Sequence, residues 1–226
     1  MFSRVPQRYD LINRLTTWRM DEVWRARAVR ECLRGDPKNI LDICCGTGDL
    51  LLRLAKSAPE GVRLAGIDFS PGMLETARAK VASAGHDDRV SLLMGDIAEL
   101  PFPRGYFDVV GISFAFRNLT YRNPRTDLYL AEIRRVLSPE GHFVIVESSQ
   151  PSQRALRAAY HLYLRWVVAG LGGLISGSRG AYRYLSRSAA GYYAPDDLTD
   201  LLIEAGFDQV RYRSLFGGVA AIHVAR

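Results

Sequence analysis

Short runs of apolar residues alternate along the middle of the chain with segments in which apolar residues recur every three or four positions. The runs, which predict buried strands, occupy residues 39–43, 63–68, 90–94, 107–113 and 142–147. Helical spacing is found over residues 49–56, 71–83 and 128–137. A strand that helices cover on both faces is apolar almost throughout. The alternation therefore predicts a mostly parallel, doubly wound sheet of the Rossmann-like α/β class.

The two ends of the chain depart from this alternation. Apolar residues with helical spacing fill residues 1–36, where we expect an N-terminal helical cap. An insert rich in Tyr, Arg and Gly, residues 151–193, is predicted to form a lid. A helix over residues 196–205 then precedes two strands, 207–213 and 219–224, which we expect to pair as an antiparallel hairpin at the sheet edge.

The composition of residues 1–226 is that of an ordinary globular protein, with 48% hydrophobic and 24% charged residues. No linker or internal repeat marks a boundary, so we expect a single domain. Cys32, Cys44 and Cys45 have no metal-ligand spacing, which predicts no metal site and fits a reduced, cytoplasmic location. The N-terminus lacks the apolar core of a signal peptide, and no run approaches the ~20 apolar residues of a membrane span.

The net charge of +6 is compatible with a nucleic acid, an anionic membrane surface or an acidic cofactor as partner. The basic residues are scattered rather than gathered in a run interleaved with aromatic residues. This distribution favours an ordinary solvated surface first and a contact with the membrane surface second, with no nucleic acid as partner.

The loop between the first strand and its helix carries the first candidate site. It contains Asp42, Gly46, Thr47 and Gly48 at the carboxyl end of a strand, where doubly wound sheets bind their ligands. The two glycines let the backbone turn tightly and a ligand approach closely, and the amides of the helix N-terminus point toward a ligand carboxylate. A Gly-x-Gly alone is also compatible with an ordinary tight turn.

Two further strand ends carry polar residues. Asp68 ends the second strand, where its carboxylate can accept hydrogen bonds from both hydroxyls of a ribose. Asp96 and Ile97 follow the third strand, where an adenine would lie. Dinucleotide sites carry a third glycine three residues after Gly48, but Leu51 stands there. The pattern therefore counts against a dinucleotide.

The loop Asp42-x-Cys44-x-Gly46-x-Gly48 resembles that of class I methyltransferases, which bind S-adenosylmethionine. That family usually has a glycine where Cys44 stands. A cysteine is small enough for such a turn, so we interpret the difference as variation within the family. Cys44 and Cys45 are expected to be packing residues.

Further motifs are spread along nearly the whole chain. They are Tyr9-Asp10-x-x-Asn13, Trp24-Arg25, Cys45-Gly46-Thr47-Gly48-Asp49, Gly72-Met73-Leu74, Leu100-Pro101-Phe102-Pro103, Phe114-Ala115-Phe116-Arg117-Asn118, Tyr182-Arg183-Tyr184-Leu185 with Ser188, and residues 217–223. With them the chain resembles the C-methyltransferases of menaquinone and ubiquinone biosynthesis. That family usually has glycine in place of Ala115 and Glu-Phe-Ser-x-Pro in place of residues 147–151, differences that concern the quinol pocket more than the reaction.

The resemblance implies S-adenosylmethionine as cofactor, with S-adenosylhomocysteine as product, and a polyprenylated quinol as substrate. Of the two candidate substrates, demethylmenaquinol is preferred to the benzoquinol of the ubiquinone pathway. The residues expected to contact the cofactor are Asp42, Gly46, Thr47, Gly48, Asp68, Phe69, Met73, Asp96, Ile97 and Ser113. The oligomeric state stays open, with a homodimer as one alternative.

The chemistry points to Arg117, Asn118 and Tyr9 as candidate catalytic residues. Methyl transfer from a sulfonium is an in-line displacement, so the enzyme must hold the acceptor carbon near the methyl group. The ring carbon becomes nucleophilic when a phenol proton leaves, and a polar group near that oxygen assists.

We expect Arg117 to stabilise the phenolate or to orient a water that accepts the proton, because a guanidinium keeps its own proton and makes arginine a poor base. Asn118 would hydrogen-bond the quinol oxygen, and Tyr9 would close the site. In the alternative interpretation Arg117 and Asn118 form a structural pair that caps the next helix, and Tyr9 is a packing residue.

Six apolar residues of the insert fall close to one face of a predicted helix. They are Tyr160, Tyr163, Leu164, Val167, Val168 and Leu171. Such a face suits an amphipathic segment over a pocket for a prenyl tail, or an ordinary core-facing helix. With Arg157 and Arg165 nearby, we expect the lid to bring the protein to the inner face of the cell membrane. Two functional alternatives remain, a methyltransferase for another phenol or sterol-like acceptor and an RNA methyltransferase relative.

Overall fold

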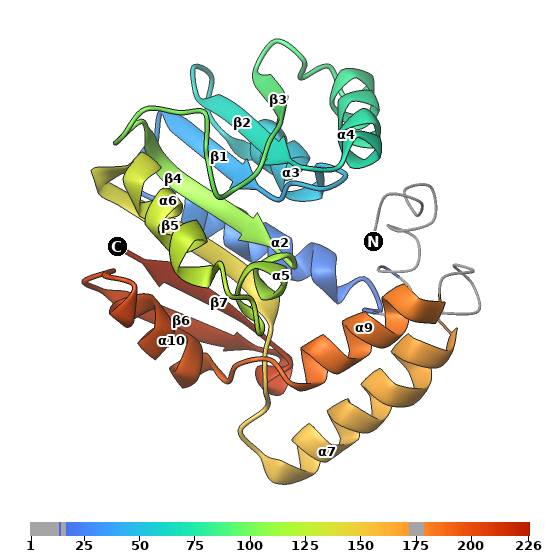
Figure 1. Cartoon of the computed structure of the whole chain (residues 1–226). Helices are drawn as coiled ribbons and strands as arrows, with labels where there is room; N and C mark the ends of the chain where they lie inside the picture. Colours follow the sequence, from blue (N-terminus) through green and yellow to red (C-terminus); the bar gives the residue numbers. More distant parts are fainter. Residues whose placement is uncertain (1–13, 15–16, 172–178) are drawn as a thin grey trace.

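The computed structural model describes residue 14, residues 17–171 and residues 179–226, which build one seven-stranded sheet (Figure 1). The strands are β1 (Asn39–Ile43), β2 (Arg63–Asp68), β3 (Val90–Met94), β4 (Phe107–Ser113), β5 (Leu137–Ser148), β6 (Val210–Leu215) and β7 (Ala220–Ala225). Their order is β3-β2-β1-β4-β5-β7-β6. Strands β1 to β5 pair in parallel, whereas β7 runs antiparallel to β5 and to β6. The predicted fold class, including the antiparallel edge hairpin, is confirmed.

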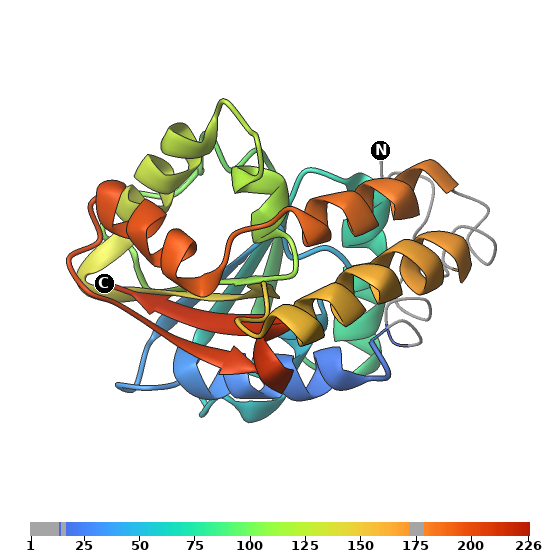
Figure 2. The same ribbon diagram turned by 90° about the horizontal axis from the view of Figure 1, so that it is seen from below.

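Helices cover both faces of this sheet (Figure 2). One layer contains α2 (Met20–Cys32), α3 (Asp49–Ser57) and α4 (Pro71–Ser83), and the other contains α5 (Phe116–Thr120), α6 (Thr126–Val136) and α10 (Pro195–Glu204). The described part of the predicted N-terminal cap is thus a helix that packs on the sheet. Its residues Trp24, Ala28 and Val29 belong to the same core cluster as residues of α3.

Alternation along β1 explains why both faces need a helical layer. Successive side chains of a strand point to opposite faces. Ile40 packs into the cluster with α2 and α3, whereas Leu41 and Ile43 pack into the cluster with α5, α6 and α10. All three are fully buried, and each contributes roughly 1.5–3 kcal/mol of hydrophobic stabilisation. The apolar run therefore fixes the strand at the centre of two cores.

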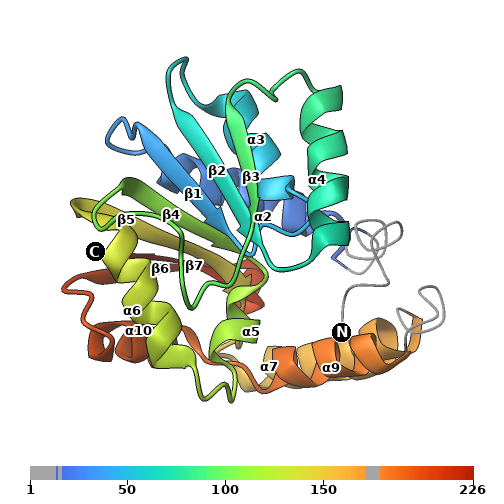
Figure 3. The same cartoon turned by 45° about the horizontal axis from the view of Figure 1, so that its top comes forward.

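The predicted lid is a pair of helices that projects from the sheet (Figure 3). Helix α7 (Arg154–Tyr163) continues into a π-helical segment, η1 (Leu164–Leu171), and α9 (Arg179–Ala190) returns alongside it. Tyr160, Leu164 and Val168 are buried in a cluster with Tyr182 and Ala189 of α9. The apolar face expected over the pocket is therefore closed by α9, as the core-facing alternative predicts.

Differences from the predicted elements occur where local pattern is weak. The short helix α5 was not predicted, because five residues are too few to establish a period. Strand β5 begins at Leu137 rather than at residue 142, since Phe107 pairs with Leu137 before a register shift at Val109. Strand β6 begins at Val210, and a 3-10 turn over Phe216–Gly218 joins it to β7.

Gly218 lets the base of the lid pack closely against the end of the sheet, so its replacement should destabilise the protein. Its φ is 96°, and a Cβ at this position would lie 2.9 Å from Cα of Pro151, at the base of the lid. Gly218→Ala should lower the free energy of unfolding by about 2–4 kcal/mol, of which about 1–2 kcal/mol comes from left-handed backbone alone. Gly61→Ala is the matched control, because Gly61 has φ 86° with nothing within 4 Å. Equal losses in urea unfolding would contradict the close approach.

Candidate functional site

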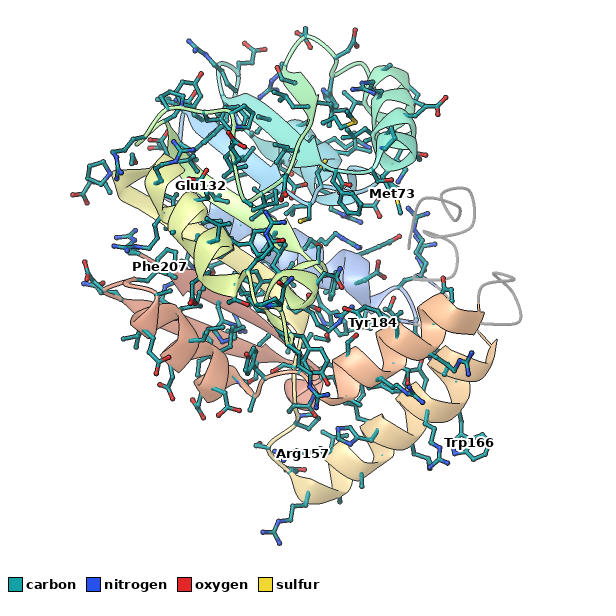
Figure 4. The ribbon with its side chains drawn as sticks, in the orientation of Figure 1. Met73, Glu132, Arg157, Trp166, Tyr184 and Phe207 are labelled. Atoms are coloured by element: carbon teal, nitrogen blue, oxygen red, sulfur yellow. The ribbon has the colours of Figure 1, made fainter. Side chains whose placement is uncertain are left out.

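A cavity of about 420 Å³ opens at the carboxyl ends of the parallel strands. The predicted site residues that line it are Asp42, Gly46, Thr47, Asp68, Phe69, Met73, Asp96, Ile97, Ser113 and Asn118. Figure 4 labels Met73 in the first turn of α4. Gly48 and Arg117 are not part of the lining, and Tyr9 lies outside the described residues. The strand-end argument therefore brings ten predicted residues together in one cavity.

The loop after β1 takes its shape from three alternate positions with positive φ. The φ angles are 49° at Cys44, 55° at Gly46 and 79° at Gly48. Cys44 thus adopts the left-handed conformation that favours the glycine usual in class I methyltransferases, at a cost of roughly 1–2 kcal/mol. A Cβ at Gly48 would lie 3.1 Å from Cβ of Ala77, so this glycine lets α4 approach the loop.

Backbone hydrogen bonds orient the Asp68 carboxylate and leave it able to accept further hydrogen bonds. Its Oδ2 accepts a hydrogen bond from the backbone N–H of Gly46 and its Oδ1 one from that of Ser70, both at 2.9 Å. Burial raises the pKa of Asp68, and these amide donors oppose the shift. Each carboxylate oxygen has a second lone pair, so the group can accept two further hydrogen bonds, as a ribose diol offers.

Two apolar side chains of the cavity, those of Phe69 and Ile97, are placed to contact a flat ring bound beside Asp68. Phe69, next to Asp68, is 68% exposed, although it belongs to the lining. Ile97 is buried on the segment after β3, and Asp96 accepts a hydrogen bond from the Ala98 amide and pairs with Arg125 at 3.1 Å. An exposed aromatic residue beside an acceptor-rich strand end is suited to bind an adenine.

Asp42 presents an unsatisfied acceptor inside the cavity. The side chain is 1% exposed, and its Oδ2 has no hydrogen-bond partner. Burial raises the pKa of Asp42 well above its ordinary value, and nearby Arg25 only partly offsets this. For Asp49 burial acts in the same direction, but Arg25 and Lys80 outweigh it and the pKa is lowered. A buried acceptor without a donor fits a ligand that brings one, such as an ammonium group.

Arg25 is the main contributor to the site that the sequence did not assign. Helix α2 carries it into the cavity, where Nε donates to Oγ of Ser113 at 2.9 Å and Nη1 pairs with Asp21. The remaining lining residues not assigned from the sequence are Cys44, Cys45, Asp49, Leu50, Ser70, Gly95, Phe114, Ala115, Leu119, Arg125 and Tyr129. The Trp24-Arg25 motif marked the position without indicating which way the side chain points.

Arg117 and Asn118 are adjacent in α5 but point in different directions. Nη1 of Arg117 donates to Oε1 of Glu147 at 2.7 Å and to Oγ of Ser148 at 3.0 Å, and Nε donates to Oγ of Ser188 at 2.9 Å. Asn118 lines the cavity, and its Oδ1 lies 3.5 Å from the hydroxyl of Tyr184. Protein groups therefore engage the Arg117 guanidinium, whereas Asn118 is open to a ligand.

The three cysteines and His223 have no part in this site's acid–base chemistry. Burial raises the pKa of Cys32, Cys44 and Cys45, which keeps the thiols protonated. His223 on β7 is 1% exposed and its Nε2 contacts the Pro195 carbonyl. Within the described residues, no group of His, Cys, Asp or Glu side chains is arranged to hold a metal ion.

The sequence is similar to methyltransferases over its full length. A sequence model of the ubiE/COQ5 methyltransferase family matches residues 1–226. A demethylmenaquinone methyltransferase of Thermus thermophilus is 46% identical over 224 residues, which cover 99% of this chain and 98% of that protein. The ubiquinone/menaquinone biosynthesis C-methyltransferase UbiE of Citrifermentans bemidjiense is 37% identical over 224 residues, covering 99% and 93%. The similarity thus includes the lid as well as the sheet.

Solved structures with this fold are less similar in sequence. A SAM-dependent methyltransferase from Aquifex aeolicus superposes with a TM-score of 0.58 at 20% identity, over 83% of this chain and 81% of that chain. The pyocyanin biosynthetic protein PhzM superposes with a TM-score of 0.66 at 20% identity, over 90% and 54%. At such identities the likeness confirms the class I methyltransferase fold and nothing finer.

Asp68 should be the residue on which S-adenosylmethionine affinity depends most strongly. If Asp68 accepts from both ribose hydroxyls, Asp68→Asn removes its negative charge and one of its two acceptor oxygens, so the dissociation constant should rise about 10- to 100-fold. Isothermal titration calorimetry measures this, with Asp87→Asn as a control at an exposed acid outside the cavity. Melting of the free protein checks that the Gly46 contact survives. Unchanged affinity in a folded Asp68→Asn protein would show that the diol binds elsewhere.

Proposed function

Because the chain belongs to the ubiE/COQ5 methyltransferase family, we propose that it transfers the methyl group of S-adenosylmethionine to a ring carbon of demethylmenaquinol, giving menaquinol. The observation that carries this proposal is the 46% identity, over 99% of the chain, to a protein named as a demethylmenaquinone methyltransferase. The geometry supports it, because one cavity joins the strand-end polar residues to Asn118 on α5.

The residues present fit S-adenosylmethionine. Asp42 would accept from its ammonium group, the loop amides near Thr47 would bind its carboxylate, and Asp68 would accept from its ribose hydroxyls. Asp96 and Ile97 would border the adenine. When bound, the cofactor supplies an electrophilic methyl group on a sulfonium. The task left to the protein is to place the acceptor carbon in line with that methyl group.

At the acceptor side, Asn118 would hydrogen-bond the quinol oxygen and so orient the ring. Arg117 is better described as a positioning residue than as a contact to the phenolate, because Glu147, Ser148 and Ser188 already hold its guanidinium. By fixing α5 to the end of β5, Arg117 determines where Asn118 points. A direct role for Tyr9 in closing the site stays a prediction.

Two alternatives concern the acceptor. The 2-polyprenyl-6-methoxy-1,4-benzoquinol of ubiquinone biosynthesis is the first, and the printed name of the Citrifermentans relative includes both pathways. The second is another small molecule or an RNA. Filter binding of tRNA across a range of salt tests the nucleic-acid alternative, since only tight, salt-sensitive binding would support it.

The substrate's prenyl tail requires access to a membrane. None of the helices in the described ranges is long and apolar enough to cross a bilayer. We propose that the protein works from the cytoplasmic side and touches the membrane surface through its lid, where Leu162 and Trp166 are 58% and 65% exposed. Figure 4 shows Trp166 pointing away from α9. A homodimer is compatible with this arrangement and is tested by light scattering.

Asn118→Ala should slow turnover without weakening cofactor binding. Loss of an orienting hydrogen bond in the transition state is expected to reduce kcat about 10- to 100-fold, while the S-adenosylmethionine dissociation constant stays within about twofold. Mass spectrometry of ring methylation, with reduced short-chain demethylmenaquinone and the benzoquinol analogue in parallel, measures the rate and identifies the acceptor. Gln153→Ala, at an exposed amide outside the cavity, is the control. Wild-type protein that methylates neither quinol would overturn the proposed function.

Glu147→Gln distinguishes a positioning role of Arg117 from direct contact with the phenolate. It keeps the shape of the carboxylate but removes its charge, so it should lower the free energy of unfolding by roughly 3 kcal/mol. If Arg117 only positions α5, kcat should fall while the pKa in the pH profile of kcat stays unchanged. If Arg117 faces the phenolate, the uncompensated guanidinium should shift that pKa downward. Glu60→Gln, at an exposed acid, is the control.

A further inference from the structure

The whole net charge of the protein is located on the lid. The chain has 30 basic and 24 acidic residues. Between Ser148 and Pro195 there is no Asp or Glu, and the basic residues there are Arg154, Arg157, Arg165, Arg179, Arg183 and Arg187. The rest of the chain therefore has equal numbers of positive and negative residues. Such a distribution concentrates the field on one projecting element rather than on the sheet.

Three arginines meet at a second cavity, of about 420 Å³, between α9 and the turn after α5. Arg183 and Arg187 stand one helical turn apart on α9, and Arg122 comes from the turn. Arg122 has φ 52°, and its guanidinium lies 5.3 Å from the ring centroid of Tyr121. Strained backbone and a ring stack thus hold its side chain beside α9.

This second cavity has the chemistry of an anion site. No acidic residue lines it, and in the described part of the chain Arg122, Arg183 and Arg187 have no carboxylate partner. Guanidinium groups match the geometry of phosphate oxygens and can bind them in pairs. Tyr121 and Tyr184 also line the cavity. Without an anion, the positive charges of the three arginines would repel one another.

The second cavity adjoins the methyl-transfer site. Tyr184 lines it and lies 3.5 Å, hydroxyl to Oδ1, from Asn118, which lines the first cavity. Ser188 lines it as well, and its hydroxyl accepts from Nε of Arg117. An anion bound in the second cavity would therefore lie next to Tyr184 and Ser188 of α9. These two residues contact Asn118 and Arg117 of α5.

We propose that Arg122, Arg183 and Arg187 bind the phosphate of an anionic phospholipid and so dock the lid on a bilayer. The inference rests on the proposed quinol substrate, whose prenyl tail lies in that bilayer. A lipid phosphate is favoured over a dissolved one, because Arg154, Arg157 and Arg165, on the lid outside the cavity, are exposed and extend the positive surface beyond it. Each basic residue near an anionic leaflet strengthens attachment, whereas a single phosphate needs only the cavity.

Vesicle co-sedimentation tests the proposal with the full chain. Arg183→Gln combined with Arg187→Gln should reduce binding to phosphatidylglycerol vesicles on the order of tenfold, and wild-type protein should bind phosphatidylcholine vesicles weakly. Arg63→Gln with Arg104→Gln removes the same charge at exposed positions away from the lid and should leave binding within about twofold. Equal losses in the two double variants would overturn the proposal.

Two further measurements define the ligand. Arg154→Gln with Arg165→Gln, on the lid but outside the cavity, should weaken vesicle binding less than Arg183→Gln with Arg187→Gln. An equal effect would mean diffuse attraction and no phosphate site. Inorganic phosphate at millimolar concentration should not displace the protein from phosphatidylglycerol vesicles. Displacement would assign the cavity to a dissolved anion and overturn the lipid assignment.

The docking site and the proposed reaction can fail separately. Vesicle binding is read without any methyl transfer, so absence of quinol methylation leaves it measurable. If both hold, Arg183→Gln with Arg187→Gln should lower methylation of vesicle-embedded long-chain quinol more than that of a water-soluble short-chain quinol, by about the factor lost in vesicle binding. An equal loss on both substrates would show that the arginines act on the reaction itself.

Discussion

The buried pair of Arg117 and Glu147 connects three parts of the protein that the sequence keeps far apart. Both side chains are almost fully buried, which is unfavourable unless hydrogen bonds replace the lost water. Glu147 accepts from the backbone N–H groups of Arg117 and Ser148, and Ser188 brings α9 to the same guanidinium. The end of β5, the start of α5 and the lid must therefore fit together, or a charge is left buried without a partner.

The cofactor side follows a different constraint, set by backbone conformation. Positive φ at Cys44, Gly46 and Gly48 turns the loop so that the Gly46 amide reaches Asp68 at the end of the neighbouring strand. One hydrogen bond thus couples two strand ends, and the carboxylate is oriented before any ligand arrives. Preorganised acceptors lose little freedom on binding, which favours affinity. A cysteine at the first of these positions costs strain but leaves the geometry in place.

Much of the fold could be predicted because buried parallel strands leave a continuous apolar signal. The bounds of β1 to β4 and of α4 agree with those expected from the sequence. The lining of the cavity was predictable for a related reason, since residues that end parallel strands meet at one edge of the sheet. Directions of side chains on short helices were not predictable. Nothing in the order Arg117-Asn118 tells which residue faces the cavity, because Glu147 lies thirty positions later.

The lid carries a local positive charge that the net charge of the whole chain does not reveal. A net charge of +6 spread over 226 residues is unremarkable, and the basic residues look scattered when read along the chain. Folding changes this, since α7, η1 and α9 gather arginines from a segment without acids onto one projecting element. Apolar residues that suggested a membrane face instead pack between these helices, as the burial of Tyr160 and Leu164 shows. The lid exposes arginines together with Leu162 and Trp166, so electrostatic attraction, supplemented by these two apolar side chains, is the interaction that would hold it at an anionic surface.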